Sequence, residues 1–242
     1  MQLENFYGEA SGKIHFTRKQ ASDFAKQVAG DFNPIHNEDA KRFCVPGDLL
    51  FALLLKKFGI SQQMRVTFAG MVSDGVALHF NESSSDNIVI VDDKDKEYLN
   101  LAHSGETSHN ATLIHNIICR YVEFSGQTFP HILVPLMKER NVMINPDRPL
   151  VIYESMVIDI DDLNIEQPEL ALSNSTLKVD GKRGSVCLMF NLLSNGNVIG
   201  KGEKNMVLSG LREYDEARVQ QLVNDYDAQK SAATSQDATT VQ

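Results

Sequence analysis

A short segment of the sequence brings a carboxylate, an amide and an imidazole together around a proline. It runs from Gly30 to His36 and reads Gly-Asp-Phe-Asn-Pro-Ile-His. Pro34 prevents a regular helix and favours an extended residue before it, so the loop can fold Asp31 and His36 toward one point. A histidine and a carboxylate that flank one water can deprotonate it and return a proton to a second atom. Asn33 offers donors and an acceptor that can pin the loop. We therefore predict Asp31, Asn33 and His36 as catalytic residues.

The element that follows this loop is predicted to supply backbone donors. Pro46-Gly47 opens a helix that ends at Phe58 and is apolar on all sides, so protein must surround it. The first N–H groups of a helix have no acceptor within it, and the helix dipole favours negative charge there. We expect Gly47 and Asp48 to donate these N–H groups to a carbonyl oxygen on which negative charge develops. Gly47 would also let a ligand approach the backbone closely.

The loop and its flanking helices carry a family signature. With Phe24 on the preceding helix and Pro46-Gly47 before the buried helix, residues 30–36 resemble the signature of the MaoC-like dehydratases, which include the (R)-specific enoyl-CoA hydratases. The resemblance covers roughly residues 1–60 at motif level. It implies hydration or dehydration of an enoyl or 3-hydroxyacyl thioester, carried by coenzyme A or acyl carrier protein, with no organic cofactor and no metal. The whole chain also resembles an uncharacterised bacterial double-hotdog family of this length.

The same resemblance suggests where a substrate would bind. We predict five substrate-binding residues, which are Phe24, Phe32, Pro34, Lys41 and Arg42. Basic side chains near the motif could meet the coenzyme A phosphates, although long basic side chains also cover apolar surface; they are Lys41, Arg42, Lys56, Lys57 and Arg65. Arg42 stands where the family usually has a small residue, and Pro46 replaces the histidine of its His-Gly pair, so substrate fit is where this chain departs most from the family.

Two other functions compete with hydration. A hotdog thioesterase would use Asp48, at the start of the buried helix, to activate water against the thioester carbonyl. A binding module would hold an acyl thioester in the same pocket without turnover. Separate Asp31→Asn and Asp48→Asn variants discriminate between the two enzymes, since each mechanism predicts loss of activity in only one of them.

Helices and short strands are predicted in the same order in both halves of the chain. In the first half, Thr17 caps a helix over Arg18–Ala29 that ends at Gly30. The strands expected there are Lys13–Phe16, Met64–Ala69, Gly75–Phe80, Asn87–Val91 and Tyr98–His103. In the second half we expect helices near Asn110–Phe124 and Pro130–Glu139, then strands at Leu150–Asp159, Glu169–Val179, Ser185–Leu193 and Val198–Leu208.

This order predicts an α+β double hotdog, with two antiparallel sheets that each wrap around a central helix. The segments Phe68–Val72 and Tyr153–Val157 are similar in sequence, which supports a duplication of the hotdog repeat. The predicted divisions are a first hotdog repeat with the motif, a second, degenerate repeat, a C-terminal helix that begins at Leu211, and a disordered tail rich in Ser, Ala, Thr and Gln. They cover residues 1–105, 106–210, 211–228 and 229–242. The apolar stripe of the C-terminal helix consists of Val219, Leu222, Val223 and Tyr226.

The second half lacks an acid at the position of Asp31. One register aligns Asn110–His115 with Asp31–His36, and another aligns Ser125–Pro130 with residues 29–34. Either register replaces Asp31 with an amide, Asn110 or Gln127, which cannot exchange a proton at neutral pH. We therefore expect one catalytic site per chain, in the first half, and leave the register open.

Composition limits the partners and the cellular compartment that the sequence allows. The 242 residues include 23 basic and 32 acidic side chains, a net charge of −9, which disfavours nucleic acid and membrane surfaces as partners. Three unpaired cysteines, the absence of a long apolar run and an acidic N-terminal segment favour a cytoplasmic protein. His103, His109 and His115 are spaced by six, which is not a metal-binding pattern. Pairing of hotdog sheets would give a homodimer, but the oligomeric state stays open.

Overall fold

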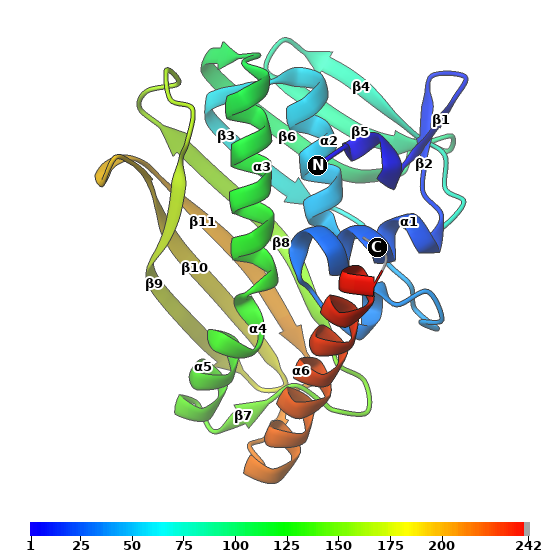
Figure 1. Cartoon of the computed structure of the whole chain (residues 1–242), viewed down its shortest axis with the longest axis vertical. Helices are drawn as coiled ribbons and strands as arrows, with labels where there is room; N and C mark the ends of the chain where they lie inside the picture. The colour runs from blue at the N-terminus through cyan, green and yellow to red at the C-terminus, as the bar shows by residue number, and fades with distance from the viewer. Residues whose placement is uncertain (240–242) are drawn as a thin grey trace.

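The computed structural model describes residues 1–239 as an α+β fold (Figure 1). Its helices are the 3-10 helix η1 Leu3–Phe6, α1 Arg18–Asp23, the π-helix η2 Phe24–Ala29, the 3-10 helix η3 Pro34–His36, α2 Gly47–Phe58, α3 Ala111–Gly126, α4 Thr128–His131, α5 Leu133–Glu139 and α6 Glu216–Thr239. Its strands are β1 Gly8–Ala10, β2 Lys13–His15, β3 Ile60–Phe68, β4 Leu78–Ser84, β5 Asn87–Asp92, β6 Glu97–Ser108, β7 Val142–Met143, β8 Val151–Ile160, β9 Glu169–Asp180, β10 Arg183–Ser194, β11 Asn197–Ser209 and β12 Arg212–Glu213.

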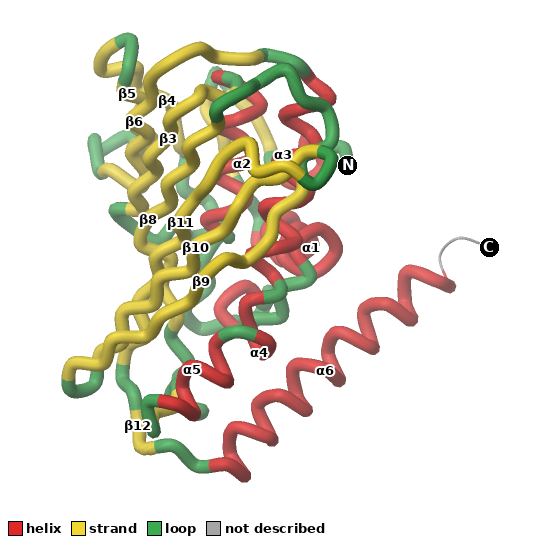
Figure 2. The backbone as a smooth tube through the Cα atoms, turned by 90° about the vertical axis from the view of Figure 1, so that its left-hand side faces the viewer, coloured by secondary structure: helices red, strands yellow, loops and turns green. Residues whose placement is uncertain are grey.

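One antiparallel sheet runs through both halves of the chain. Within residues 1–239 it has ten strands in the order β1-β2-β4-β5-β6-β3-β8-β11-β10-β9, and β7 pairs separately with β12. The helices lie on one face of this sheet, with α6 outermost (Figure 2). The prediction of two separate sheets is therefore corrected. β3 and β8 pair from Gln63 with Asp159 to Thr67 with Ser155, because each would otherwise leave an edge of unpaired backbone groups.

The two halves of the sheet have the same internal order. The first half runs β4-β5-β6-β3 and the second runs β9-β10-β11-β8, so matching strands meet at the β3–β8 junction. Phe68 at the end of β3 and Tyr153 on β8 stack there with ring centroids 4.3 Å apart. This order fits a division into repeats over residues 1–105 and 106–210, which stays a prediction.

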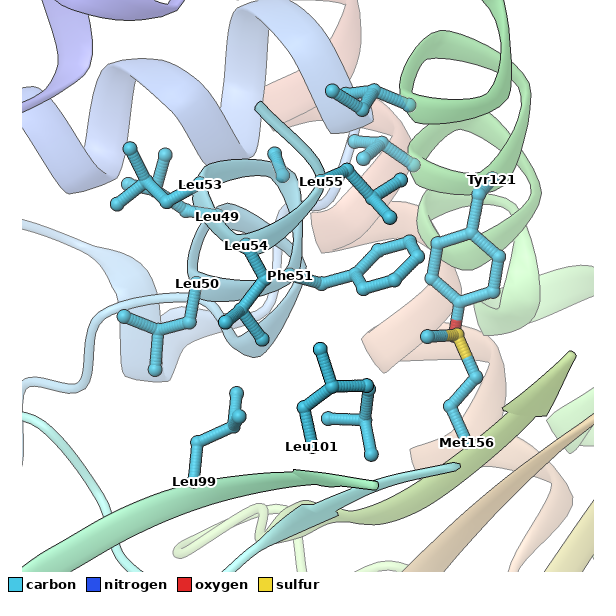
Figure 3. Close-up of a cluster of buried hydrophobic side chains, with 14 of the residues drawn as sticks. Leu49, Leu50, Phe51, Leu53, Leu54, Leu55, Leu99, Leu101, Tyr121 and Met156 are labelled. Atoms are coloured by element: carbon cyan, nitrogen blue, oxygen red, sulfur yellow. The ribbon is translucent and has the colours of Figure 1, made fainter. Parts of the chain in front are cut away.

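The apolar helix α2 forms the centre of the core, as its sequence predicts. Leu49, Leu54 and Leu55 are fully buried, and Figure 3 shows the leucines of α2 pointing outward on all sides of the helix. Phe51 extends toward Tyr121 of α3, with ring centroids 5.1 Å apart. Because α2 lies between the sheet and its neighbouring helices, its N-terminus is fixed inside the protein.

Most predicted elements form, and the differences lie at their ends. Thr17 caps α1 through a capping box with Gln20, and Gly30 ends the following π-helix with φ +62°. The C-terminal helix begins at Glu216 rather than Leu211, because residues 212–213 pair with β7. It continues to Thr239, so the predicted tail is helical over 229–239, and residues 240–242 lie outside the described part.

Candidate active site

A cavity of about 580 Å³ lies where the 31–36 loop, the start of α2 and the end of α3 meet. Strands β8 and β11 and helices α5 and α6 are among the other elements that line it. The predicted residues that line it are Asp31, Phe32, Asn33, Pro34, His36, Gly47 and Asp48. The fold thus brings seven of the ten predicted site residues to one cavity.

Local hydrogen bonds hold the loop in its bent shape. The backbone N–H of Asn33 donates to Asp31 Oδ1 at 2.9 Å, and the Asn33 side chain accepts from the Ile35 N–H at 3.2 Å. Pro34 then starts a single 3-10 turn that ends at His36. These are the contacts expected of an Asx turn followed by proline, so the short sequence itself sets the bend. Asn33 pins the loop, while its catalytic role stays a prediction.

Asp31 and His36 face one another across this bend. His36 Nε2 lies 3.7 Å from Asp31 Oδ2, which is longer than a direct hydrogen bond but lets one water reach both atoms. His36 Nδ1 lies 2.7 Å from the carbonyl oxygen of Cys44. Because a carbonyl only accepts, Nδ1 must carry the proton, and Nε2 of the neutral ring is left as an acceptor toward Asp31.

The carboxyl group of Asp31 is perturbed by its surroundings. Burial raises the pKa of Asp31, and nearby Asp48 raises it further, while His36, the Asn33 N–H and Lys204 lower it. Burial is the largest of these effects because it removes water from the charged form. A carboxyl with a raised pKa next to an imidazole is an arrangement that can exchange protons.

The N-terminus of α2 opens onto the same cavity. No side chain caps it, Leu49 and Leu50 both donate to the Pro46 carbonyl, and within residues 1–239 no acceptor pairs with the N–H groups of Gly47 or Asp48. A Cβ on Gly47 would come within 3.0 Å of Phe68 and Tyr153 side-chain atoms. Glycine is therefore required here by two protein rings, in addition to any ligand.

A buried polar cluster that the sequence analysis did not identify lies beside that N-terminus. Asp48 is 6% exposed, and its Oδ2 accepts a hydrogen bond from Ser125 at the end of α3. Lys204 of β11 is 4% exposed and donates to the Ser125 hydroxyl, with Nζ 3.7 Å from Asp48 Oδ1. Burial lowers the pKa of Lys204, against the opposing effects of Asp48 and Asp31.

The sequence contained one signal for this lysine. Gly202, Lys204, Met206 and Leu208 alternate along β11 and are all buried, so the two-residue period of a strand places Lys204 on the inner face. No such local signal exists for Ser125, because its role depends on where α3 ends relative to α2.

Tyr226 of α6 also contacts the site loop. Its hydroxyl lies 2.8 Å from the Gly30 carbonyl oxygen and 3.0 Å from that of Gly126, and its ring packs on Phe32 with centroids 5.6 Å apart. Burial raises the pKa of Tyr226, so the phenol stays protonated and donates. The apolar stripe of the C-terminal helix included Tyr226, but the sequence did not indicate what its hydroxyl would bind.

Three predicted substrate-binding residues lie away from the cavity. Phe24 is fully buried and packs edge-on against Phe6 at 5.5 Å, so it belongs to the core. Lys41 and Arg42 are exposed and do not line the cavity. For Phe24 the physical reason is its place on the inner side of the π-helix. Lys41 and Arg42 lie outside the cavity because they are on the outward side of the segment that precedes α2.

Neither predicted register gives a second copy of the site. Asn110 caps α3 by accepting from the N–H groups of Thr112 and Leu113, and His115 lies within that helix. Ser125 and Gly126 lie at the opposite end of α3, on the wall of the cavity just described. The second half therefore contributes wall residues to the first-half site.

Comparison with known proteins places the chain in a family. The model of the family described as "Protein of unknown function (DUF3581)" matches residues 1–217. The chain belongs to the DUF3581 family. No curated protein matches it. The family match ends two residues into α6, so the residues of α6 that reach the cavity lie beyond it.

Solved structures similar to this DUF3581 chain share little sequence with it. A conserved protein of unknown function with hot dog fold from Alicyclobacillus acidocaldarius has 6% identity and a TM-score of 0.46, covering 86% of this chain and 98% of its own. An acyl-CoA thioesterase II, TesB2, from Mycobacterium marinum has 9% identity and a TM-score of 0.42, covering 89% of this chain and 99% of its own. An acyl-ACP thioesterase from Bacteroides thetaiotaomicron has 13% identity and a TM-score of 0.37, covering 85% of this chain and 100% of its own. Similarity at this level assigns no activity to this chain.

Within residues 1–239 no helix is both long and apolar enough to cross a membrane. The same part of the chain holds no group of three or more histidine, cysteine or acidic side chains arranged to bind a metal ion.

Proposed function

We propose that this protein adds water to an acyl thioester bound in the cavity, and that the reaction is hydration of an enoyl thioester or its reverse. The observation that carries the proposal is the 3.7 Å approach of His36 Nε2 and Asp31 Oδ2 on the wall of a cavity that also contains the uncapped start of α2. These groups could hold one water and polarise one carbonyl at the same time, which is what hydration requires.

In the proposed reaction, water is added across the Cα=Cβ double bond. His36 Nε2 takes a proton from the water, whose oxygen bonds to Cβ. The electron pair of the double bond moves toward Cα and the thioester oxygen, where N–H groups of α2 stabilise the negative charge. Cα then receives a proton from the Asp31–His36 pair, so that one H and one OH have been added. Asp31 suits this exchange because its pKa is raised.

The remaining cavity wall suits an acyl chain. Beyond the polar end it is lined by apolar side chains from α5, β8 and β11, including Leu133, Val151 and Met206. An apolar pocket with a few convergent polar groups is typical of sites for small, largely apolar ligands. Coenzyme A and acyl carrier protein both present such a chain, so the carrier is decided by assay.

The test follows absorbance at the enoyl-thioester band with crotonyl- to dodecenoyl-CoA, for the parent and for His36→Ala. We expect turnover by the parent and a loss of about 10²- to 10⁴-fold in kcat/KM for the variant. His109→Ala, on an exposed residue outside the cavity, is the matched control and should retain parental activity. Absence of turnover at every chain length, or full activity of His36→Ala, would refute hydration by this pair.

Hydrolysis of the thioester is a second candidate. Asp48 lines the cavity, and its buried Oδ1 has no hydrogen-bond partner among residues 1–239, so it could face a water beside the carbonyl. Release of free thiol from saturated acyl-CoA would reveal this reaction. Asp48→Asn would abolish thioester hydrolysis and Asp31→Asn would not, whereas the hydration mechanism predicts loss of activity in Asp31→Asn. Tight acyl-CoA binding with neither reaction would favour a binding module.

A further inference from the structure

The proposed dyad does not use the cluster of Asp48, Ser125 and Lys204, which lines the same cavity. Its members come from α2, α3 and β11, and both charged side chains are more than nine-tenths buried. Burying two opposite charges costs more free energy than an apolar pair of the same volume would in many proteins. The cluster therefore costs stability, and its position on the cavity wall indicates a role in ligand binding or catalysis.

Lys204 has unused hydrogen-bonding capacity. Its ammonium group carries three N–H donors, and one of them reaches the Ser125 hydroxyl. Lys204 Nζ lies 3.7 Å from Asp48 Oδ1, which is beyond hydrogen-bond length. The ring of Tyr153 lies 4.1 Å from Nζ and that of Tyr121 lies 5.7 Å away, so aromatic faces surround much of the remaining space. An ammonium group in this state can bind an oxygen atom that enters from the cavity.

The same corner holds the start of α2. Tyr153 contacts the position where Gly47 would carry a Cβ and also lies beside Lys204 Nζ. Asp48 itself follows Gly47 and approaches Lys204. The uncapped N–H groups of α2 and the Lys204 ammonium are therefore neighbours, and both favour negative charge on a ligand oxygen placed between them.

We propose that Lys204, held by Asp48 and Ser125, binds the carbonyl oxygen of the acyl thioester and stabilises the negative charge that forms there. The assignment rests on the proposed function, since it takes a thioester as the ligand. It makes the second half of the chain part of the active site through β11. A positive charge at a buried position stabilises such a charge more strongly than backbone donors alone.

The test compares two ligands that differ in the carbonyl group and cannot be hydrolysed. One is an octanoyl-CoA analogue in which CH₂ replaces sulfur and the carbonyl remains; the other is S-octyl-CoA, which lacks the carbonyl. Calorimetry measures both affinities for the parent, for Lys204→Met and for Lys201→Met, an exposed lysine on the same strand. We expect the parent and Lys201→Met to prefer the carbonyl ligand, and Lys204→Met to lose about 10- to 100-fold of that preference while binding S-octyl-CoA as before.

Each outcome decides the assignment. If Lys204→Met keeps the parental preference, Lys204 does not bind the carbonyl. The proposed chemistry of Asp31 and His36 is then still tested separately, by the enoyl-CoA hydration assay. If the parent binds neither ligand, the proposed function fails for coenzyme A thioesters and the assignment fails with it. Should Lys204→Met not fold, because it leaves Asp48 buried and unpaired, the Asp48→Asn/Lys204→Met double variant removes both charges. The double variant must show the same loss of preference, and its retention would overturn the assignment.

Discussion

The hydroxyl of Tyr226 lies 2.8 Å from the carbonyl oxygen of Gly30, a residue 196 positions earlier in the chain. The same hydroxyl lies 3.0 Å from a second acceptor, the carbonyl oxygen of Gly126, which is the last residue of α3. One phenol therefore joins the loop that carries Asp31 to the end of the helix that carries Ser125. Helix α6 thus fixes the relative position of the two polar groups in the cavity.

Tyr226→Phe should loosen this connection while keeping the ring contacts with Phe32 and Phe129. The carbonyls of Gly30 and Gly126 lose the one O–H donor that they share, which we expect to cost about 1 kcal/mol and lower Tm by about 2–4 °C. Because the Asp31 loop is less fixed, kcat should fall more than KM changes. Thermal denaturation and steady-state kinetics measure the two effects.

Tyr98→Phe is the control for that variant. Tyr98 donates to Asp92 at 3.1 Å, outside the cavity, so its loss should lower Tm without affecting kcat. Equal kinetics for Tyr226→Phe and Tyr98→Phe would show that α6 stabilises the fold without positioning the loop.

Asp31→Asn should stabilise the protein at neutral pH although it removes activity. Burial raises the pKa of Asp31, so the native state binds its proton more tightly than the unfolded chain does. The favourable contribution of protonated Asp31 is complete below the unfolded pKa of 3.8 and is lost as the pH rises through the higher native pKa. The Tm advantage of Asp31→Asn should therefore be small near pH 3.8 and grow toward neutral pH. A constant difference across this range would contradict the raised pKa.

The same shift sets the acid limit of activity. If Asp31 must be ionised in the free enzyme, kcat/KM should fall as the pH drops through a pKa above 3.8, the usual carboxyl value. The pH profile of enoyl-CoA hydration checks this. An acid limb at or below 3.8 would show that Asp31 is not the group whose ionisation limits the reaction.

Gly126→Ala should disrupt the contact between α3 and the site loop. A Cβ at Gly126 would overlap the Ala29 carbonyl oxygen, so the helix or the loop must move. We expect a loss of about 1–3 kcal/mol, seen as a lower denaturation midpoint, together with reduced activity. Gly70→Ala, whose Cβ would meet its nearest neighbour at 3.4 Å, should change stability much less.

Phe24→Leu tests the reassignment of Phe24 from substrate contact to core residue. Loss of the edge-on contact with Phe6 should lower the free energy of unfolding by about 1 kcal/mol. KM for enoyl-CoA should stay at the parental value, because Phe24 does not line the cavity. A selective rise in KM without loss of stability would restore the original prediction.

Sequence alone determined the features that short-range interactions control. The Asx turn at Asn33 and the proline after it set the bend of the loop, Thr17 and Gly30 set the ends of the helical segment, and the apolar pattern of α2 placed it in the core. Each depends on residues within a few positions of one another, so a single sequence is enough to predict it.

Tertiary structure decided what joins distant segments. It merged two predicted sheets into one through β3 and β8, and it brought Lys204 to Ser125 and Ser125 to Asp48 over separations of 79 and 77 residues along the chain. It also directed Phe24 inward and left Lys41 exposed. Such contacts depend on how whole elements pack, because the side chains that meet belong to strands and helices whose local patterns are satisfied in many arrangements.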